Sequence, residues 1–173
     1  MTKTRIQLTL FVEESDSEPI ENIRREFNPE QYALIKSHVT LCREEELNMI
    51  NEVIQNMEAL YFPYITVEFG SLERFANGKG VFLPVKGDNY QFHQLRQCIL
   101  LNTGNNQETH KPHITVMHPR NSTCTDQIFE QIKKMKTPDK LIFRKISLIE
   151  QKEGNKWEIL REFELKDVTG LQV

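Results

Sequence analysis

The sequence predicts an α+β fold made of two similar halves. Segments in which apolar and polar residues alternate are typical of half-buried strands. They are interspersed with segments whose apolar residues recur every three or four positions, as in amphipathic helices. One order of elements occurs twice: strand, helix, strand, helix and hairpin. We therefore expect one bilobal domain over residues 1–173, with two pseudo-symmetric antiparallel sheets flanked by outer helices around a central cleft.

The first copy of this order runs from Ile6 to Val85. Asn28-Pro29 ends or restarts its first helix, because proline removes a backbone donor. The acidic run at 44–46 suits the positive N-terminal end of its second helix. The expected elements are a strand over 6–12, a helix that includes 20–27, a strand over 37–43, a helix over 44–57, and a hairpin of strands 65–69 and 81–85.

The second copy shares the strand 81–85 with the first. Its closing hairpin is signalled by Gly154-Asn155, a pair of residues that favours a two-residue turn. The expected elements are a helix over 88–99, a short strand within 111–120, a helix over 123–135, and a hairpin of strands 141–151 and 157–165.

Composition limits the classes of function. Hydrophobic residues make up 38% of the chain and charged residues 27%, which is ordinary for a soluble globular protein, and the net charge of −3 gives no overall basic field. No stretch approaches the roughly 18 apolar residues of a membrane span, and no signal-peptide pattern opens the chain. The odd number of cysteines, three, favours reduced thiols. We therefore expect a cytoplasmic monomer without a membrane partner.

Two short segments carry the same pattern of residues. They are residues 38–41 (HVTL) and 113–116 (HITV), which begin 113 − 38 = 75 residues apart. Each lies in a predicted strand, where side chains alternate between the two faces. The aliphatic residues of each segment can therefore enter the core while its His and Thr point together to the other side. The duplicated order predicts that each half presents one such pair to the cleft.

His38, His113, Thr40 and Thr115 together suit metal-free phosphoryl transfer. Two imidazoles with pKa values near neutrality can serve as one general base and one general acid. Two hydroxyls can donate hydrogen bonds to the charged oxygens of a phosphate. We therefore predict His38 and His113 as catalytic residues and Thr40 and Thr115 as phosphate-binding residues. This chemistry needs no cofactor and no metal.

The paired His-x-Thr-x segments resemble the signature of the two-histidine (2H) phosphoesterase superfamily, and within it the 2′-5′ RNA ligase / cyclic phosphodiesterase-like branch. Pro112, the run MHPRN at 117–121 and the closing WEILREFEL at 157–165 are similar to bacterial members. The resemblance implies the bilobal fold, with the motif residues lining the cleft. It also implies cleavage or ligation of 2′-5′ or 2′,3′-cyclic phosphoester bonds without a metal. The expected partners are RNA ends, oligonucleotides or cyclic nucleotides, and no DNA partner is expected.

Three further residues are candidate substrate contacts. Arg43 follows the first motif and Arg120 the second, and each could pair with phosphate through a bidentate fork or be a surface arginine. His118 lies on the cleft-facing side if its strand extends that far. It could then touch substrate, or it could simply end the strand.

Several alternatives remain open. Phe11, Phe75 and Phe82 could stack a nucleobase, although phenylalanines at strand spacing more often pack in a core. A zinc site is a less favoured interpretation, because its candidate ligands match no familiar zinc spacing. Those candidates are His110, His113, His118 and Cys124. The alternative functions are an RNA-end or nucleotide binding module with little turnover, or a 2′-5′ RNA ligase. The two intact His-Thr pairs favour an enzyme.

Overall fold

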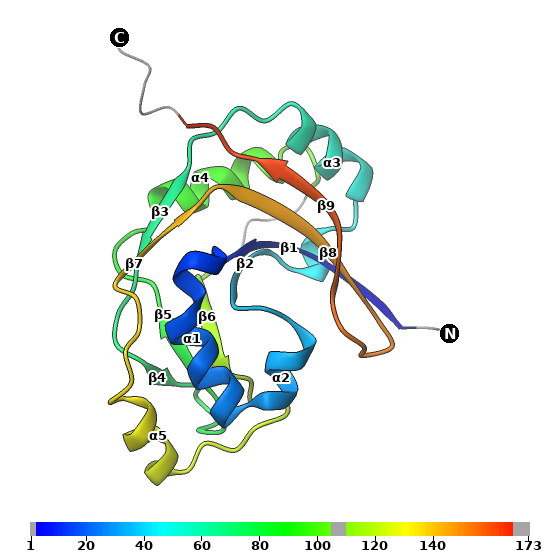
Figure 1. Cartoon of the computed structure of the whole chain (residues 1–173). Coiled ribbons are helices and arrows are strands. Elements are labelled where there is room, and N and C mark those ends of the chain that lie inside the picture. Colours follow the sequence, from blue (N-terminus) through cyan, green and yellow to red (C-terminus); the bar gives the residue numbers. More distant parts are fainter. Residues whose placement is uncertain (1–2, 105–109, 168–173) are drawn as a thin grey trace.

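The computed structural model describes residues 3–104 and 110–167 (Figure 1). Its elements, in chain order, are β1 (Thr4–Phe11), α1 (Glu14–Phe27), α2 (Pro29–Leu34), β2 (His38–Cys42), the 3₁₀ turn η1 (Glu44–Glu46), α3 (Ile50–Glu58), β3 (Ile65–Glu68), β4 (Glu73–Arg74), β5 (Val81–Pro84), α4 (Tyr90–Ile99), β6 (His113–Met117), α5 (Asp126–Ile132), β7 (Lys140–Phe143), β8 (Lys145–Lys152) and β9 (Glu158–Glu164). The predicted α+β class is confirmed. Within the described ranges, no helix is long and apolar enough to cross a membrane.

The two motif strands, β2 and β6, lie side by side at the centre of the main sheet. Over the described residues this sheet has seven strands in the order β4-β5-β6-β2-β1-β8-β9, and neighbouring strands are antiparallel. β2 and β6 are joined at the pair Val39↔Ile114. In Figure 1, α3 and α4 lie toward one end of the molecule, and α1, α2 and α5 lie toward the other.

The halves on either side of this central pair repeat each other in register. β1 pairs with β2, and β5 with β6, through matching partners, and both pairings contain a bulge at the same place. The matching pairs are Leu8↔Cys42 and Val81↔Met117, Thr9↔Thr40 and Phe82↔Thr115, Leu10↔Val39 and Leu83↔Ile114, and Phe11↔His38 and Pro84↔His113. A bulge inserts one unpaired residue and re-aims the strand beyond it. Each motif strand is therefore redirected at its C-terminal end.

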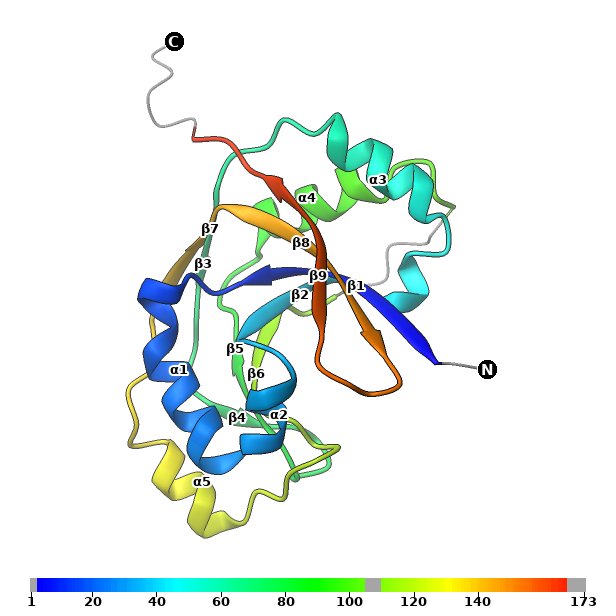
Figure 2. The ribbon, with the colours of Figure 1, turned by 45° about the vertical axis from the view of Figure 1, so that its right-hand side comes forward.

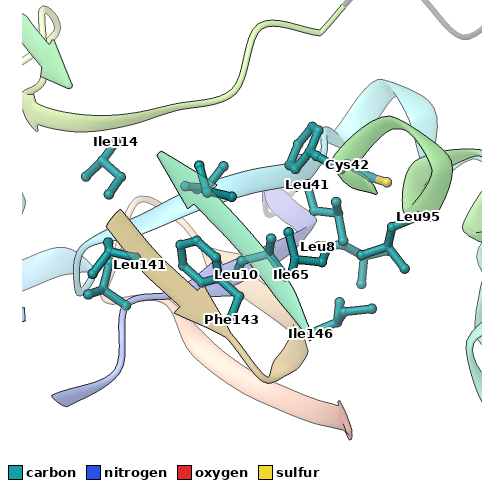
Figure 3. Packing of buried hydrophobic residues seen from close by; sticks show 14 of the residues in the cluster. Leu8, Leu10, Leu41, Cys42, Ile65, Leu95, Ile114, Leu141, Phe143 and Ile146 are labelled. Atoms are coloured by element: carbon teal, nitrogen blue, oxygen red, sulfur yellow. The ribbon is translucent and has the colours of Figure 1, made fainter. Parts of the chain in front are cut away.

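The hydrophobic core covers one face of the motif strands. Val39 and Ile114, opposite each other in the sheet, have no exposed surface. Figure 3 shows side chains of β1 and β2 close to those of β3 and β7, the two strands of a separate small sheet. Burying one such aliphatic side chain stabilises the fold by about 1.5–3 kcal/mol. This burial fixes which face of β2 and β6 is turned inward.

The helix expected over 44–57 is wrong in its first part. Residues Glu44–Glu46 form the 3₁₀ turn η1, and α3 begins at Ile50. The carboxylate of Glu46 accepts the backbone N–H of Arg43 at 2.8 Å and also pairs with Arg96 of α4. These bonds tie the acidic run to the end of β2 and to another helix. Tertiary contacts therefore override the local preference for a helix start.

Two expected strand arrangements are also wrong. β3 pairs with β7 and not with β5, to which it is linked through the isolated bridge Phe69↔Val85. The strand expected over 141–151 divides at Arg144, since β7 pairs with β3 while β8 pairs with β1 in the main sheet. An alternating pattern predicts a strand but not its partner.

Candidate active site

The structure brings the two His-Thr pairs to one face of the β2–β6 junction. Val39 and Ile114 are opposite each other and point into the core. Because side chains alternate along a strand, their neighbours His38, Thr40, His113 and Thr115 lie on the other face. All four are partly exposed, whereas the residues between them are buried. By the same antiparallel register, His38 is next to Thr115 and His113 is next to Thr40.

Both histidines are held in the same tautomer. Nδ1 of His38 lies 2.7 Å from the carbonyl oxygen of Lys36, and Nδ1 of His113 lies 3.0 Å from that of Lys111. A carbonyl oxygen can only accept, so each Nδ1 must carry the proton. In the neutral imidazole, Nε2 is therefore the basic nitrogen. Each ring can use Nε2 as a base when neutral or as a proton donor when charged.

Burial lowers the pKa of both imidazoles and so favours their neutral form. It lowers the pKa of His38 to about 4, against the opposing effect of the bond to Lys36, and the nearby charge of Arg24 lowers the pKa further. Burial also lowers the pKa of His113, with a smaller contribution from the charge of Arg43. A bound phosphate would raise both pKa values, because a nearby negative charge favours the imidazolium.

The phenylalanines that the sequence analysis considered for base stacking lie beside the histidines. The ring of Phe11 contacts His38 edge-on at a centroid distance of 5.9 Å. Phe75 and Phe82 contact His113 at 5.7 and 5.4 Å. All three phenylalanines are partly exposed, so their rings are accessible beside the reacting groups.

The three weaker candidates lie where the motif strands end. Arg43 is exposed, and its guanidinium is 3.9 Å from Glu45. β6 ends at Met117, which is buried after the bulge, so His118 follows directly on the opposite side. Nδ1 of His118 accepts the backbone N–H of Arg120 at 3.1 Å, so Nε2 of the neutral ring carries the proton. Burial, followed by the charges of Arg120 and Arg5, lowers the pKa of His118 to about 4.

Sequence reasoning did not find the buried ion pair that supports His38. Arg24 and Glu21 of α1 are 2.6 Å apart, and Arg24 is 1% exposed. Arg24 donates to the carbonyl of Ile35 at 2.6 Å, and Glu21 accepts the N–H of Ser37 at 2.5 Å. The pair therefore holds both sides of the residue whose carbonyl orients His38. The sequence feature that could have indicated this pair is Arg24, which directly follows Ile23 on the apolar face of a predicted helix.

His110 is a second functional candidate that the motifs did not reveal. It is 5% exposed, its Nε2 donates to the carbonyl of Thr40 at 2.9 Å, and its ring stacks on Phe92 at 5.8 Å. His110 is thus a support beneath the first motif. Cys124, another residue of the zinc alternative, directs its Sγ to the carbonyl of Thr125 at 3.6 Å. Among the described residues, no group of three or more His, Cys, Asp or Glu side chains could hold a metal ion.

Comparison with known proteins decides the family. The model of the 2′-5′ RNA ligase superfamily matches residues 12–155, which include both motifs. The chain belongs to the 2′-5′ RNA ligase superfamily. This confirms the resemblance drawn from the two motifs and supports a 2H phosphoesterase-type activity. A search of curated proteins gives no match.

Solved structures share the fold of this superfamily member at low sequence identity. E. coli LigT in the apo form superposes with a TM-score of 0.64 at 15% identity, over 95% of this chain and 98% of LigT. A crystal structure described as a phosphoesterase has a TM-score of 0.66 at 14% identity, over 95% of this chain and 100% of that chain. LigT complexed with 3′-AMP gives 0.66 at 14% identity, over 95% and 99%. These likenesses extend to the whole fold.

Proposed function

We propose that this protein is a metal-independent phosphodiesterase acting on 2′,3′-cyclic phosphates or 2′-5′ phosphodiester bonds of RNA ends or nucleotides. The observation that carries the proposal is the pair of imidazoles at the β2–β6 junction, each with Nδ1 bound to a carbonyl and each beside a threonine. Membership of the 2′-5′ RNA ligase superfamily supports it. The complex of LigT with 3′-AMP supports a nucleotide as the type of ligand.

Hydrolysis of a 2′,3′-cyclic phosphate would use the two histidines in complementary states. A water oxygen attacks phosphorus, and one bond between phosphorus and a ribose oxygen breaks. Nε2 of one neutral histidine removes a proton from the water. The other histidine, protonated once the anionic phosphate is bound, gives its Nε2 proton to the leaving ribose oxygen. The hydroxyls of Thr40 and Thr115 donate to the non-bridging oxygens, and the histidines exchange roles in the reverse direction.

Arg43 and His118 would contact substrate from the two ends of the site. Each is the first residue after its motif strand, and the backbone N–H of each is bound at 2.8 Å by a side chain, Glu46 for Arg43 and Asn28 for His118. Arg43 offers a guanidinium and His118 offers an Nε2–H. Arg120 acts on the site by fixing the ring of His118 through its backbone N–H.

The test compares variants on small substrates in the presence of EDTA. Wild type, His38→Ala and His113→Ala are assayed on the four nucleoside 2′,3′-cyclic monophosphates and on 2′-5′-linked adenylyl adenosine. His93→Ala, in α4 outside the site, is the matched control. Each motif variant should lose about 100- to 10,000-fold in kcat, the range of general acid–base catalysis, and the control should not. Loss of activity in EDTA, or full activity of either motif variant, would contradict the proposal. Tight nucleotide binding without turnover would instead indicate a binding module.

A further inference from the structure

A polar part of the sheet face that carries the motif residues lies next to Thr40 and has no part in the chemistry described above. The amide Nε2 of Gln7, on β1, is 3.4 Å from the hydroxyl oxygen of Thr40. Arg5 is two residues earlier on the same strand, so it lies on the same face. A strand rises about 3.3 Å per residue, which places the backbone of Arg5 roughly 7 Å beyond that of Gln7. The face thus continues past the phosphate-binding threonine.

Arg5 places its guanidinium over the ring of Trp157. Its guanidinium carbon is 5.3 Å from the centre of the Trp157 ring, its Nε donates to Glu44 at 3.0 Å, and its Nη1 donates to Gln151 at 3.4 Å. These bonds fix the plane of the guanidinium. The charge of Arg5 also contributes to the lowered pKa of His118, the residue that follows β6.

The β8–β9 hairpin carries Trp157 to this position. The backbone N–H of Trp157 donates to the carbonyl of Leu34, at the end of α2, with a distance of 2.9 Å. Figures 1 and 2 both show the hairpin turn extending away from the rest of the main sheet toward α2. The Trp157 ring is partly exposed. The Arg5–Trp157 pair is thus anchored from three elements: β1, the hairpin and α2.

We propose that Arg5 and Trp157 form a subsite for a second nucleoside, the one that leaves with a free 5′-hydroxyl when a 2′-5′ linkage is cleaved. This inference rests on the proposed function. In that reaction the adjacent 3′-hydroxyl oxygen attacks phosphorus, and the bond from phosphorus to the 5′ oxygen breaks. One histidine accepts the proton of the 3′-hydroxyl and the other gives a proton to the 5′ oxygen. The products are a 2′,3′-cyclic phosphate and a 5′-hydroxyl nucleoside.

The positions of these residues relative to the motif residues suit the two nucleosides to opposite sides of the site. The nucleoside that keeps the phosphate is closed onto phosphorus through a five-membered ring, so its base must lie close to the reacting groups. Phe75 and Phe82, which contact the ring of His113 directly, suit it. The leaving nucleoside is attached through its 5′ carbon and extends further from phosphorus. Arg5 and Trp157, beyond Gln7, are at the more distant position, and both guanidinium planes and aromatic rings stack bases.

Kinetics on two substrates test the subsite. Trp157→Ala should raise KM for 2′-5′-linked adenylyl adenosine about 5- to 150-fold, the range expected for one base stack. The same variant should leave kcat and KM for adenosine 2′,3′-cyclic phosphate within about twofold, because that substrate has one nucleoside. Trp157→Phe should restore most of the dinucleotide KM, and Arg5→Ala should raise it. Tyr61→Ala, an exposed aromatic side chain in the turn after α3, is the matched control and should change neither substrate.

Fluorescence gives a second readout that does not depend on turnover. Trp157 is the single tryptophan of the chain. In the His38→Ala variant, the dinucleotide should quench its emission saturably and adenosine 2′,3′-cyclic phosphate should not. Equal kinetic effects of Trp157→Ala on both substrates, no effect on either, or turnover of the cyclic phosphate alone by wild type would overturn the subsite and leave the proposed function standing. Turnover of neither substrate by wild type would overturn both.

Discussion

β2 and β6 carry the same motif in the same register, but different side chains hold their histidines. His38 follows a segment fixed by the buried ion pair Glu21–Arg24, which binds the backbone on both sides of Lys36. The ring of His113 is instead packed against Phe75 and Phe82. A buried ion pair supports the backbone beside His38 only, whereas aromatic rings contact both histidines, one at His38 and two at His113.

The two halves also differ at the positions that pair with the threonines. Thr9 pairs with Thr40, is fully buried and donates to the carbonyl of Val39 at 3.0 Å. Phe82, its counterpart, pairs with Thr115 and is partly exposed. β1 therefore places a buried threonine beside Thr40, whereas β5 places a partly exposed phenylalanine beside Thr115. A duplicated backbone can place two equivalent His-Thr pairs while the side chains around them differ.

The largest expected effect is the loss of stability on breaking the buried Glu21–Arg24 ion pair near His38. Arg24→Met should destabilise the protein by about 3–5 kcal/mol, because it leaves the Glu21 carboxylate without its partner in a buried site. Urea unfolding measures the change. Glu21→Gln/Arg24→Met is the control and should lose less than the single variant, since no charge remains. A single variant within about 1 kcal/mol of wild type would show that the pair does not support this segment.

The packing of Phe75 against His113 should be sensitive to a side chain added at Gly80. A Cβ there would lie 2.5 Å from the carbonyl oxygen of Met117 and 2.9 Å from Cδ2 of Phe75. Gly80→Ala should cost about 1–3 kcal/mol, as overpacking does, and should displace Phe75 from His113. NMR of the imidazole signals checks this, with His113 shifted and His38 as the internal control. Unchanged His113 signals would contradict the prediction.

Stability should fall with acid through the buried histidines. Burial lowers the pKa of His110 to about 4, below the ordinary value of 6.5 that it has in the unfolded chain. Between these values the unfolded state binds more protons, so stability decreases as pH falls from about 6.5 toward 4. The contribution of His110 is at most about 1.4 kcal/mol per pH unit. His110→Gln should flatten urea-unfolding stability measured from pH 7 to 4.5. A decline parallel to that of wild type would be evidence against this titration.

The smallest expected effects are on the pKa values of the two motif histidines. The charge of Arg24 lowers the pKa of His38, and the charge of Arg43 lowers that of His113. Glu21→Gln/Arg24→Met should therefore raise the pKa of His38 and leave that of His113 unchanged, and Arg43→Met should do the reverse. NMR titration of both rings measures each effect in one experiment. Equal shifts of both rings in either variant would mean that the two environments are not distinct.

The periodicity of apolar residues predicted the features that depend only on neighbouring residues, namely the faces of the motif strands and the main helices. The alternation in 38–41 and 113–116 places each His beside its Thr on one face, because residues two apart on a strand always share a face. Helical spacing of apolar residues predicted α1 and α4 for a similar reason. The acidic run at 44–46 misled the prediction because Glu46 is bound to Arg96 of α4, a contact distant in sequence.

The sequence alone thus determined the fold class, the two His-Thr pairs and the face that each pair occupies. The tertiary structure decided that β2 pairs with β6 and that a bulge turns Met117 inward and returns His118 to the face that carries the motif histidines. It also decided that Arg24, His110 and Trp157 lie beside the site. The physical reason is how far apart in the sequence the interacting residues are. The face of a strand follows from its own backbone geometry, whereas pairing, bulges and buried charges depend on which distant segments share one core.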